Sequence, residues 1–389
     1  MSKGGSWIAW LQGFAYRAGR FLIVPFFIRR FNTLVDEQPA LLPPYVVAAN
    51  HVTELDFFFL GKLFKTPMGF VVGQGLLQNR LLAFLFVKVF GCIAKQKGTA
   101  DARTTMGMLR RLKARRNVCL FVEGNTTFDG KTGPIPSATG SLLRAVSAGL
   151  VTCRIEGGYF AMPRWGKGIR RGRTACRVIN TYTKEALSRM SKELINQLLA
   201  QDLYEDAYTR QKNDPVPYKG IKTAEGIEHA LYLCPLCLTQ GSIAGADNQV
   251  ACKACGKTSV YTPYGILEGD FSFSTLLDWT AWQKEKLEKL LLENPVQPIL
   301  YDDLQTLYQQ QADSTLKRFA EGVMRMGGES FMIGQFRIPI KEITGFEIYR
   351  KNILQLTLSD GRLFQTGRKR GFNALKYRDL YSIIKEKSV

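Results

Sequence analysis

The sequence predicts an α/β fold in its first half and a smaller β-rich fold towards its end, with a cysteine-rich segment between them. Three observations lead to this prediction. Apolar, β-prone segments alternate with segments of helical periodicity over residues 45–183, which is typical of a largely parallel sheet flanked by helices. Two Cys-x-x-Cys pairs follow between residues 234 and 255. Beyond residue 299 apolar and polar residues alternate, as they do in antiparallel strands.

The net charge of +20 is unevenly distributed along the 389 residues. Residues 1–180 contain 26 Lys and Arg against 8 Asp and Glu, so a net +18 (26 − 8) lies in this part of the chain. Such an asymmetry indicates a polyanionic partner: nucleic acid, an anionic membrane surface or a phosphorylated substrate. The composition, 46% hydrophobic and 22% charged, is that of a globular chain and excludes a disordered one.

Residues 6–31 are apolar and aromatic, with four arginines among them and a proline at position 25. The proline interrupts the segment, which therefore lacks the run of about 20 apolar residues that a spanning helix needs. Trp and Phe next to Arg suit the membrane interface, so we predict that residues 1–35 lie on an anionic membrane as a helix or helical hairpin. The alternative is a helix packed on the core of its own domain. No signal peptide is evident, which predicts a cytoplasmic protein, peripheral on the inner face of the membrane.

An α/β domain is predicted over residues 36–212. Strands are expected at residues 45–49, 68–72, 91–94, 117–122, 150–155 and 174–183, and helices at 57–64, 76–90, 101–116, 137–148 and 191–212. In such sheets the functional side chains collect at the carboxyl ends of the strands. His51 and Glu123 each follow a predicted strand, so we expect both at that edge of the sheet.

His51, one of only two histidines, precedes Asp56 by five residues. A neutral imidazole beside a carboxylate is the usual apparatus for removing a proton from a hydroxyl near neutral pH. Residues five apart on an ideal helix point about 140° away from each other, so the pair requires His51 on a turn and Asp56 in the first turn of the following helix. The alternative is a surface histidine at a strand end.

The block Asn50-His51-x4-Asp56, followed later by Phe121-Val122-Glu123-Gly124, resembles the glycerolipid acyltransferases of the 1-acylglycerol-3-phosphate acyltransferase (PlsC) type. That family has an Asn-His-x4-Asp block and a Phe-Pro-Glu-Gly-Thr-Arg block. Its intervening Gly-x-Ile strand and basic residue are matched by Gly91-Cys92-Ile93 and Lys97, and its later Val-Pro-Val strand aligns with Val151-Thr152-Cys153. The resemblance covers residues 5–212.

This resemblance implies an O-acyltransferase that moves a fatty acyl group from acyl-CoA or an acyl-carrier protein to the hydroxyl of a lysophospholipid such as 1-acylglycerol-3-phosphate. His51 would be the general base, Asp56 would orient it, and Glu123 would complete the catalytic set by ordering the acceptor. No cysteine or serine lies in a nucleophile context, which favours direct transfer over an acyl-enzyme. The resemblance assigns substrate binding to Lys97, Gly124, Asn125 and Thr126.

The sequence departs from the family pattern at Asn125 and Thr126, which stand where the family has Thr and Arg. The arginine expected to bind the phosphate of the acceptor is therefore missing, and Lys131 and Arg154 are the candidates to replace it. Thr152 replaces the strand proline. A further basic cluster in the following loop either serves the same purpose or forms a solvated loop that faces anionic lipid. It consists of Arg164, Lys167, Arg170, Arg171 and Arg173.

Cys234, Cys237, Cys252 and Cys255 form two Cys-x-x-Cys pairs at the separation of a zinc ribbon, predicted within residues 213–265. Four thiolates leave no open coordination position, so the Zn2+ would be structural and would fold a segment too small to fold alone. The alternative is a redox-active pair. The other four cysteines are scattered in apolar contexts and are predicted to be reduced core residues.

Residues 266–389 are predicted to form a helix followed by a β-rich domain. The helix is expected at residues 276–293, the strands at 330–340, 344–350, 353–358 and 363–366, and a last helix at about 373–385. Ser359-Asp360-Gly361 indicates a hairpin turn. Antiparallel strands capped by a C-terminal helix are similar to a pleckstrin-homology-like (PH-like) barrel, by pattern only.

The function that these observations favour is that of a peripheral membrane acyltransferase with a structural zinc ribbon. Two other functions stay open. One is that of a catalytically weakened, lipid-binding relative of the family, which the departure at Thr126 makes credible, and the other is that of a zinc-ribbon protein that binds nucleic acid. The chain beyond residue 180 is nearly neutral, whereas nucleic-acid-binding modules concentrate Lys and Arg, so no nucleic-acid partner is expected.

Overall fold

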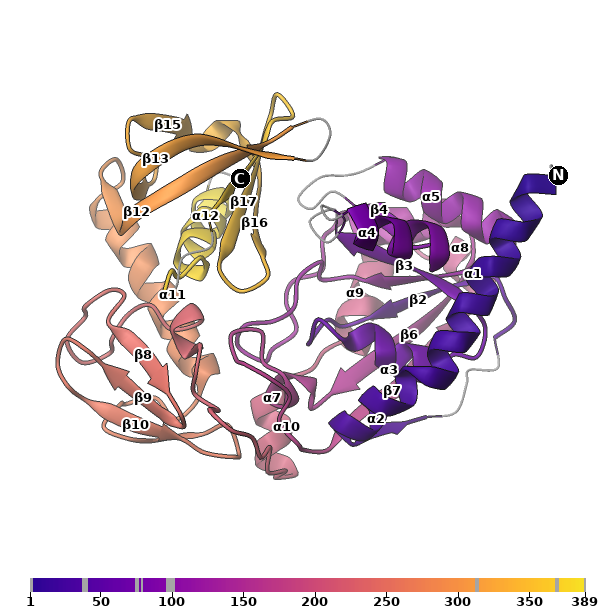
Figure 1. The fold of residues 1–389 in the computed structure, drawn as a ribbon, viewed down its shortest axis with the longest axis horizontal. Coiled ribbons are helices and arrows are strands. Elements are labelled where there is room, and N and C mark those ends of the chain that lie inside the picture. The colour runs from indigo at the N-terminus through magenta and orange to yellow at the C-terminus, as the bar shows by residue number, and fades with distance from the viewer. Residues whose placement is uncertain are drawn as a thin grey trace. The chain divides into compact units, whose positions relative to one another are not determined.

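The computed structural model describes residues 3–36, 41–73, 77, 80–95, 102–311, 315–367 and 371–387. The chain forms two compact units, drawn in Figure 1. The first comprises residues 1–164 and 168–220, and the second comprises residues 165–167 and 221–389. The short segment 165–167 therefore belongs to the second unit, although the residues on both sides of it belong to the first.

The first unit is built on a seven-stranded sheet in the order β1-β7-β6-β2-β5-β3-β4. Its strands are β1 (Thr33–Val35), β2 (Tyr45–Ala49), β3 (Met68–Gly73), β4 (Ile93–Lys95), β5 (Asn117–Phe121), β6 (Gly149–Glu156) and β7 (Thr174–Tyr182). All neighbouring pairs in this sheet are parallel except β6 and β7. The prediction of a largely parallel sheet is confirmed.

Helices cover both faces of this sheet (Figure 1). They are α1 (Lys3–Leu22), α2 (Val24–Phe31), α3 (Asp56–Leu63), α4 (Arg80–Ala83), the π-helix η2 (Phe84–Val89), α5 (Ala102–Lys113), α6 (Ala138–Val146), α7 (Gly158–Ala161), α8 (Lys184–Arg189), α9 (Lys192–Asp202) and α10 (Ala207–Asn213). On one face, Val46 and Leu120 of the sheet share a buried core with Met108 of α5, Leu143 of α6 and Leu199 of α9. α1, α2 and α3 lie together on the other face (Figure 1).

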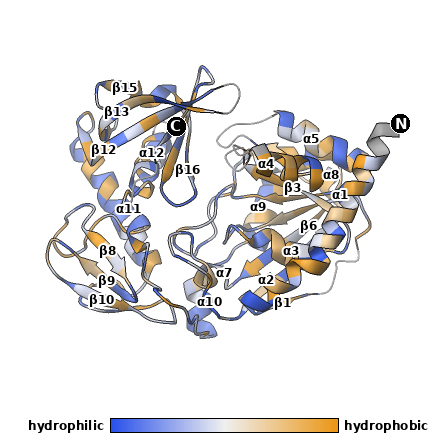
Figure 2. Ribbon diagram, in the orientation of Figure 1, coloured by the Kyte–Doolittle hydropathy of each residue, from blue (hydrophilic) through white to orange (hydrophobic). Residues whose placement is uncertain are grey.

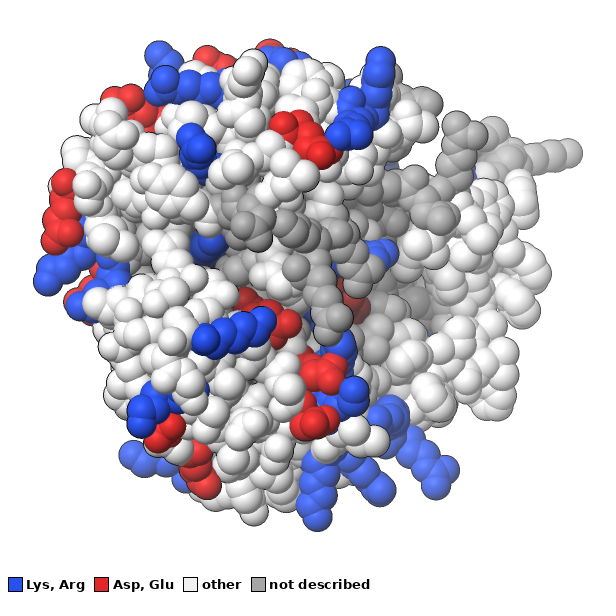
Figure 3. Space-filling view, turned by 60° about the vertical axis from the view of Figure 1, so that its left-hand side comes forward, with Lys and Arg blue, Asp and Glu red and all other residues white. Residues whose placement is uncertain are grey.

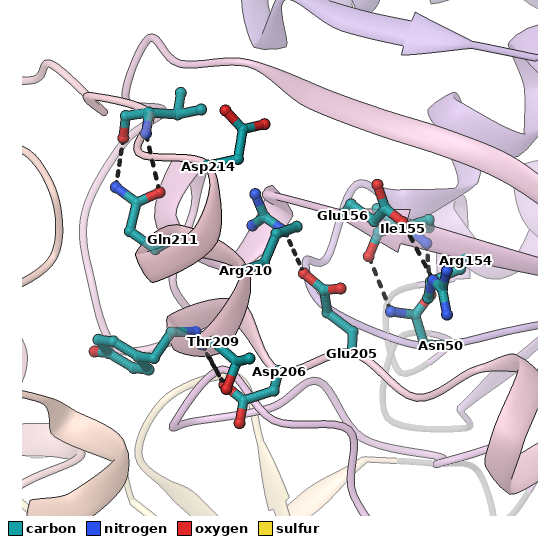
Figure 4. A network of polar contacts seen from close by, with 12 residues as sticks. Asn50, Arg154, Ile155, Glu156, Glu205, Asp206, Thr209, Arg210, Gln211 and Asp214 are labelled. Carbon is teal, nitrogen blue, oxygen red and sulfur yellow. Dashed lines mark hydrogen bonds and ion pairs between the residues drawn. The ribbon is translucent and has the colours of Figure 1, made fainter.

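The single helix expected at residues 191–212 is two helices, α9 and α10, so that prediction is wrong. Between them the carbonyl of Leu203 accepts a hydrogen bond from Thr132 Oγ1 at 3.0 Å, and that of Glu205 accepts one from the Thr132 N–H at 2.9 Å. α10 then begins after Asp206, whose Oδ1 accepts hydrogen bonds from the N–H groups of Tyr208 and Thr209, each at 3.0 Å (Figure 4). An aspartate at this position stabilises the start of a new helix.

Polar groups of α1 face the rest of the first unit. Gln12 Nε2 donates to the carbonyl of Lys88 at 3.1 Å, and the hydroxyl of Tyr16 donates to the carbonyl of Phe64 at 2.9 Å. Two Trp and two Phe side chains of α1 are exposed instead, and Figure 2 colours the helix by hydropathy. They are Trp7 (59% exposed), Trp10 (64%), Phe14 (54%) and Phe21 (79%). In the described parts of the chain, every helix falls short of the length and apolar character required to cross a membrane.

The second unit contains a four-stranded sheet of order β11-β10-β9-β8 and a seven-stranded sheet of order β15-β14-β13-β12-β18-β17-β16. The smaller sheet and its flanking helices are η3 (Ile227–His229), β8 (Ile243–Ala246), β9 (Gln249–Cys252), β10 (Thr258–Tyr261), β11 (Leu267–Gly269) and α11 (Leu276–Glu293). The larger sheet consists of β12 (Pro298–Gln310), β13 (Leu316–Gly327), β14 (Ser330–Ile333), β15 (Phe336–Pro339), β16 (Ile343–Tyr349), β17 (Ile353–Leu358) and β18 (Leu363–Thr366), with η4 (Ile340–Glu342) and the final helix α12 (Leu375–Lys387). Its strand pairs are antiparallel, and the predicted β-rich region is confirmed.

Glycines make two of the turns in the larger sheet. The strand expected at residues 330–340 is the hairpin of β14 and β15, and Gly334 in its turn has φ of 57°, a conformation that glycine adopts readily. The long strands β12 and β13 had no predicted bounds. The predicted turn at Ser359-Asp360-Gly361 is confirmed, because Gly361 has φ of 86° and its N–H donates to the carbonyl of Leu358 at 3.0 Å.

Candidate active site

His51 lies on the turn between β2 and α3, at the carboxyl end of β2. Its Nδ1 is 2.9 Å from Oδ2 of Asp56, the first residue of α3. The buried Asp56 carboxylate also accepts hydrogen bonds from the N–H groups of Val52 at 2.7 Å and Thr53 at 3.0 Å. These donors hold the carboxylate in place, and the carboxylate in turn orients the imidazole. The arrangement predicted for the pair, a turn followed by the first helical turn, is confirmed.

Asn50 connects the same turn to the neighbouring strand β6. Its Nδ2 donates to the carbonyl of Ile155 at 2.9 Å, and its Oδ1 accepts from the Ile155 N–H at 2.7 Å (Figure 4). Asn50 is fully buried, so these bonds satisfy polar groups that would otherwise be costly to bury. The residue before His51 is therefore held between two parallel strands.

Glu123 binds the turn from the side of β5. Its Oε1 accepts from the His51 N–H at 2.7 Å, and its Oε2 accepts from the Gly133 N–H at 2.6 Å. Burial raises the pKa of the Glu123 carboxyl to about 8, although the two N–H donors act in the opposite direction. The ring of Phe121 stacks on the imidazole of His51 with centroids 4.3 Å apart. The three predicted catalytic residues thus come together, and Glu123 contacts the backbone at His51 rather than its ring.

The loop after Glu123 carries three of the predicted substrate-binding residues. Gly124 has φ of 72°, a backbone conformation that favours glycine. Asn125 is half-buried, and Thr126, at the position of the family arginine, is buried with 7% of its surface exposed. Thr126 therefore offers no long polar side chain to a ligand. Lys97, the fourth predicted residue, lies outside the described residues.

A guanidinium group reaches this loop from elsewhere in the chain. Nη1 of Arg164 donates to the carbonyl of Thr126 at 2.9 Å, and the guanidinium lies over the ring of Phe128, 4.4 Å from its centre. Arg164 and Arg170 are both buried. The interpretation of their cluster as a solvated loop is therefore wrong for these two residues. Arg173 pairs with Asp214.

Lys131 and Arg154, the candidates to replace the missing arginine, both approach Tyr204. Lys131 is exposed, with its Nζ 5.9 Å from the centre of the Tyr204 ring. Arg154 is half-buried, and its Nη1 donates to the Tyr204 carbonyl at 3.3 Å. Its Nε also pairs with Glu156 Oε1 at 3.2 Å (Figure 4), and Glu156 Oε2 pairs with Arg177 Nε at 3.2 Å. Two cations therefore flank one half-exposed tyrosine.

Comparison with protein families gives a match within the first unit. Residues 33–156 match the model of the family described as Acyltransferase. This segment is an acyltransferase-family domain. The match contains the His51 turn and the Glu123 loop and confirms the family predicted from the sequence, while it spans less than half of the 389-residue chain.

Among solved structures, the chain is similar to the 1-acyl-sn-glycerophosphate (LPA) acyltransferase PlsC from Thermotoga maritima, with 14% identity and a TM-score of 0.39 over 51% of this chain and 84% of that chain. It is also similar to the Dm DCP1 EVH1 domain in complex with the XRN1 DBM peptide (10% identity, TM-score 0.20, 28% of this chain and 89% of that chain). A third similar structure is the C-terminal domain of an unknown protein from Leishmania infantum (16% identity, TM-score 0.17, 27% and 97%). No curated protein matches the chain.

Two polar residues that contact Thr152 and Arg154 were not predicted from the sequence. Tyr204 follows α9 and belongs to no recognisable sequence motif. Asp202, at the end of α9, is buried and accepts hydrogen bonds from Thr152 Oγ1 at 2.8 Å and from the Tyr182 hydroxyl at 2.9 Å. Thr152, which replaces the family proline, therefore supplies a hydroxyl to a buried carboxylate, and this departure at Thr152 was the available signal.

Outside the acyltransferase domain, four cysteine sulfurs of the second unit lie within 4.8 Å of one another and can hold a metal ion. The Sγ atoms of Cys234 and Cys255 are 3.9 Å apart, and those of Cys237 and Cys252 are 3.7 Å apart. A tetrahedral ion with Zn–S bonds of about 2.3 Å sets its sulfurs about 3.8 Å apart. The cysteine geometry therefore fits a tetrathiolate site. The other four cysteines are free and buried, as predicted.

Proposed function

We propose that the protein transfers a fatty acyl group from acyl-CoA or an acyl-carrier protein to the hydroxyl of a lysophospholipid such as 1-acylglycerol-3-phosphate. The observation that carries the proposal is the 2.9 Å contact between His51 Nδ1 and the buried Asp56 carboxylate. This pair lies at the carboxyl end of a strand, inside the segment that matches the acyltransferase family.

His51 is the general base of the proposed reaction. Asp56 occupies Nδ1, so Nε2 is the nitrogen that takes the proton of the acceptor hydroxyl. As the hydroxyl oxygen attacks the thioester carbonyl carbon, its proton passes to Nε2. The carbon–sulfur bond then breaks, and the leaving thiolate takes that proton to give a free thiol and the new ester. The Asp56 carboxylate stabilises the imidazolium between these steps, and such a base contributes about 10²–10⁴-fold to the rate.

Glu123 and Asn50 act as positioning residues in this mechanism. Glu123 holds the His51 N–H at 2.7 Å, and Asn50 ties the preceding residue to β6. Both contacts restrain the backbone that carries the imidazole. Gly133, on the other oxygen of Glu123, connects this restraint to the loop of residues 124–136, which we infer borders the acceptor.

The phosphate of the acceptor binds Lys131 and Arg154 in this proposal. Two connections support it. Lys131 is two residues from Gly133, which binds Glu123, and Arg154 precedes Ile155, which binds Asn50. Glu156 already compensates Arg154, whereas no carboxylate forms an ion pair with Lys131 among the described residues, so Lys131 is the charge available to a new anion. A phosphate monoester next to these cations would replace the contact that the family arginine makes.

We further propose that α1 and α2 rest on the inner face of an anionic membrane. A helix that packs on a domain in water turns its apolar side inward, whereas α1 leaves two Trp and two Phe side chains exposed to solvent. Its exposed Trp and Phe would enter the headgroup region, and the arginines of the two helices would meet anionic headgroups. The membrane would then hold the lipid substrate where the domain can reach it.

The four cysteines hold a structural Zn2+ in this proposal. The sulfur separations of 3.7 Å and 3.9 Å support it. Zinc would stabilise the fold of residues 232–257 and would supply no chemistry to the transfer. Elemental analysis of protein purified without chelator should give about one zinc per chain, and a content well below one would contradict the site.

The test of the proposed reaction uses the full-length protein in mixed micelles, with radiolabelled acyl-CoA or acyl-carrier protein and a panel of lysophospholipids. His51→Ala should abolish transfer. The matched control is His229→Gln, because His229 is the other histidine and lies in the second unit, with Nδ1 3.2 Å from the carbonyl of Phe372. Transfer that survives in His51→Ala would overturn the mechanism.

The same preparation tests the competing functions. A wild-type protein that binds lysolipid but transfers no acyl group from either thioester would be a lipid-binding relative. Salt-sensitive binding of DNA or RNA without transfer would favour the nucleic-acid hypothesis. On the face that Figure 3 shows, Lys and Arg are interspersed with Asp and Glu.

A further inference from the structure

Two arginines at the edge of the sheet opposite His51 share a neutral partner, the side-chain amide of Gln12. Arg111 is in the last turn of α5, and Arg116 precedes β5. Both Nη atoms of Arg111 are 3.4 Å from Oε1 of Gln12 in α1, and Nη1 of Arg116 is 2.8 Å from the same oxygen. The two guanidinium groups thus converge on one amide oxygen, with which Arg111 makes only long contacts.

The backbone around Arg111 is shaped to receive its guanidinium group. Gly69 of β3 and Gly91 before β4 border it, and a Cβ atom at either glycine would collide with it. Nε of Arg111 is buried and has no hydrogen-bond partner among the described residues. The backbone therefore makes room for the cation without binding all of its donors, which is costly for a buried charged group.

The surroundings do not neutralise this pair of charges. In the described part of the chain, no carboxylate forms an ion pair with either arginine or with the other basic residues near the end of α5. These are Arg110, Lys113 and Arg115. Burial and, second, the charge of Arg116 lower the pKa of Arg111 to about 10, so the group stays charged near neutral pH.

The dipole of helix α5 explains only part of this cluster of basic residues. Cations near the end of a helix are stabilised by its dipole, which accounts for the exposed basic residues of α5. Arg111 differs from them because its guanidinium points to α1 and lies between two glycines. Gln12, Arg111 and Arg116 are each only half-buried, so a small anion can reach them from solvent.

We propose that Arg111, Arg116 and Gln12 form a second, anion-binding site that takes a phosphate or phosphodiester oxyanion. Two guanidinium groups match such an anion because each can donate two parallel hydrogen bonds to its oxygens. The anion would replace Oε1 of Gln12 between them and would supply the missing negative charge. It is either free phosphate or the headgroup of a lipid, since Gln12 belongs to the helix that exposes two Trp and two Phe side chains. The site does not depend on the reaction proposed at His51.

The test follows thermal unfolding of the full-length protein in phosphate and in chloride at matched ionic strength. Arg116→Gln should need about tenfold more phosphate for the same rise in Tm, because a charge-assisted hydrogen bond is lost. Gln12→Glu places a carboxylate between the two arginines, so it should raise Tm without phosphate and abolish the response to phosphate. Lys113→Gln, on the same helix and exposed, is the matched control and should respond like the wild type.

A second arm separates the two sources of the anion. Tm is measured with phosphatidylcholine vesicles that contain or lack phosphatidic acid. A response to phosphatidic acid that exceeds the response to free phosphate, and that Gln12→Glu removes, assigns the site to a lipid headgroup. Equal phosphate and vesicle responses in Arg116→Gln, Gln12→Glu and wild type would overturn the proposal. So would a wild type that responds to neither, because the arginines would then only anchor α1.

Discussion

The two edges of the central sheet compensate their charges in different ways. At the carboxyl edge, Asp56 receives two backbone N–H groups and the His51 ring, and Glu123 receives two more N–H groups. At the amino edge, Arg111 and Arg116 share one amide oxygen. The first arrangement is complete within the chain, whereas the second has no carboxylate partner among the residues that the structure describes.

This difference indicates what each edge is prepared for. Donors that hold a carboxylate rigidly allow it to orient a base before any substrate arrives, which is the requirement of catalysis by preorganised groups. Cations without a counter-charge gain from a ligand that brings one. Substitutions at the two edges are therefore expected to affect different properties. Those at the carboxyl edge should reduce turnover, and those at the amino edge should alter the response to anions.

Asp56→Asn should have the largest effect. The asparagine NH2 group must replace either Oδ2, which faces His51 Nδ1 and the Val52 N–H, or Oδ1, which accepts from the N–H and hydroxyl of Thr53, and in neither place can it accept a hydrogen bond. The imidazole would lose its orientation and its counter-charge, so kcat/KM for acyl transfer should fall by about 100-fold or more. Steady-state assays check this, with the exposed neighbour Glu54→Gln as the control. An Asp56→Asn enzyme as active as that control would remove Asp56 from the mechanism.

Glu123→Gln should change how stability depends on pH. The fold raises the pKa of this carboxyl from 4.5 to about 8, so the folded state holds the proton more tightly than the unfolded state. The resulting stabilisation is present below about pH 4.5 and is lost as the pH rises towards about 8. Urea unfolding should therefore show a steeper fall in the free energy of unfolding for wild type than for Glu123→Gln over this range.

A second effect of Glu123→Gln is independent of pH. The new NH2 group faces one of the two N–H groups, of His51 or Gly133, and leaves it without an acceptor. This should cost about 1–3 kcal/mol at every pH. Parallel stability curves for the two proteins would show that Glu123 does not titrate in this range.

Thr152→Val extends the comparison to a third carboxylate, Asp202. Valine has the shape of threonine but lacks the hydroxyl that donates to Asp202 at 2.8 Å and accepts from the Asn180 N–H at 3.0 Å. Unfolding in urea should show a loss of about 1–3 kcal/mol, because the buried Asp202 carboxylate and the Asn180 N–H each lose a partner. Thr181→Val, at an exposed position of β7, is the control, and equal stability of the two variants would contradict the role of the hydroxyl.

Lys131→Gln should have the smallest effect. Lys131 is exposed, so water screens its charge, and KM for an acceptor with a phosphate monoester should rise by only about twofold to tenfold with kcat unchanged. The effect should vanish for an acceptor without a phosphate monoester. Lys184→Gln, another exposed lysine, controls for net charge. An equal rise of KM for both acceptors would mean that Lys131 does not contact the phosphate.

Features built from neighbouring residues were predictable from the sequence. β2 and the turn that follows it could be predicted because Asp56 binds groups only three to five residues away. The two cysteine pairs were equally recognisable, because a tetrathiolate site imposes its own spacing. In both cases the residues that form the stabilising interaction lie close together in the sequence.

Interactions between distant parts of the chain were not predictable. Arg164 lies 38 residues from the carbonyl of Thr126 that it binds, and Arg154 lies 50 residues from Tyr204. In the sequence, Arg164 is one of several basic residues of a loop. The residues next to it in the sequence do not indicate that it is buried over Phe128. The break between α9 and α10 also depends on a distant loop, through Thr132. A single sequence without tertiary contacts favours the longer helix.

The orientation of α1 has a practical consequence for anyone who handles the protein. Two Trp and two Phe side chains of this helix face the solvent, and in plain buffer they can be covered by contact with a second copy of the protein or with a vessel wall. The apparent mass in light scattering should therefore depend on whether detergent is present above its critical micelle concentration. Measurements on a preparation without detergent would then reflect self-association as well as catalysis.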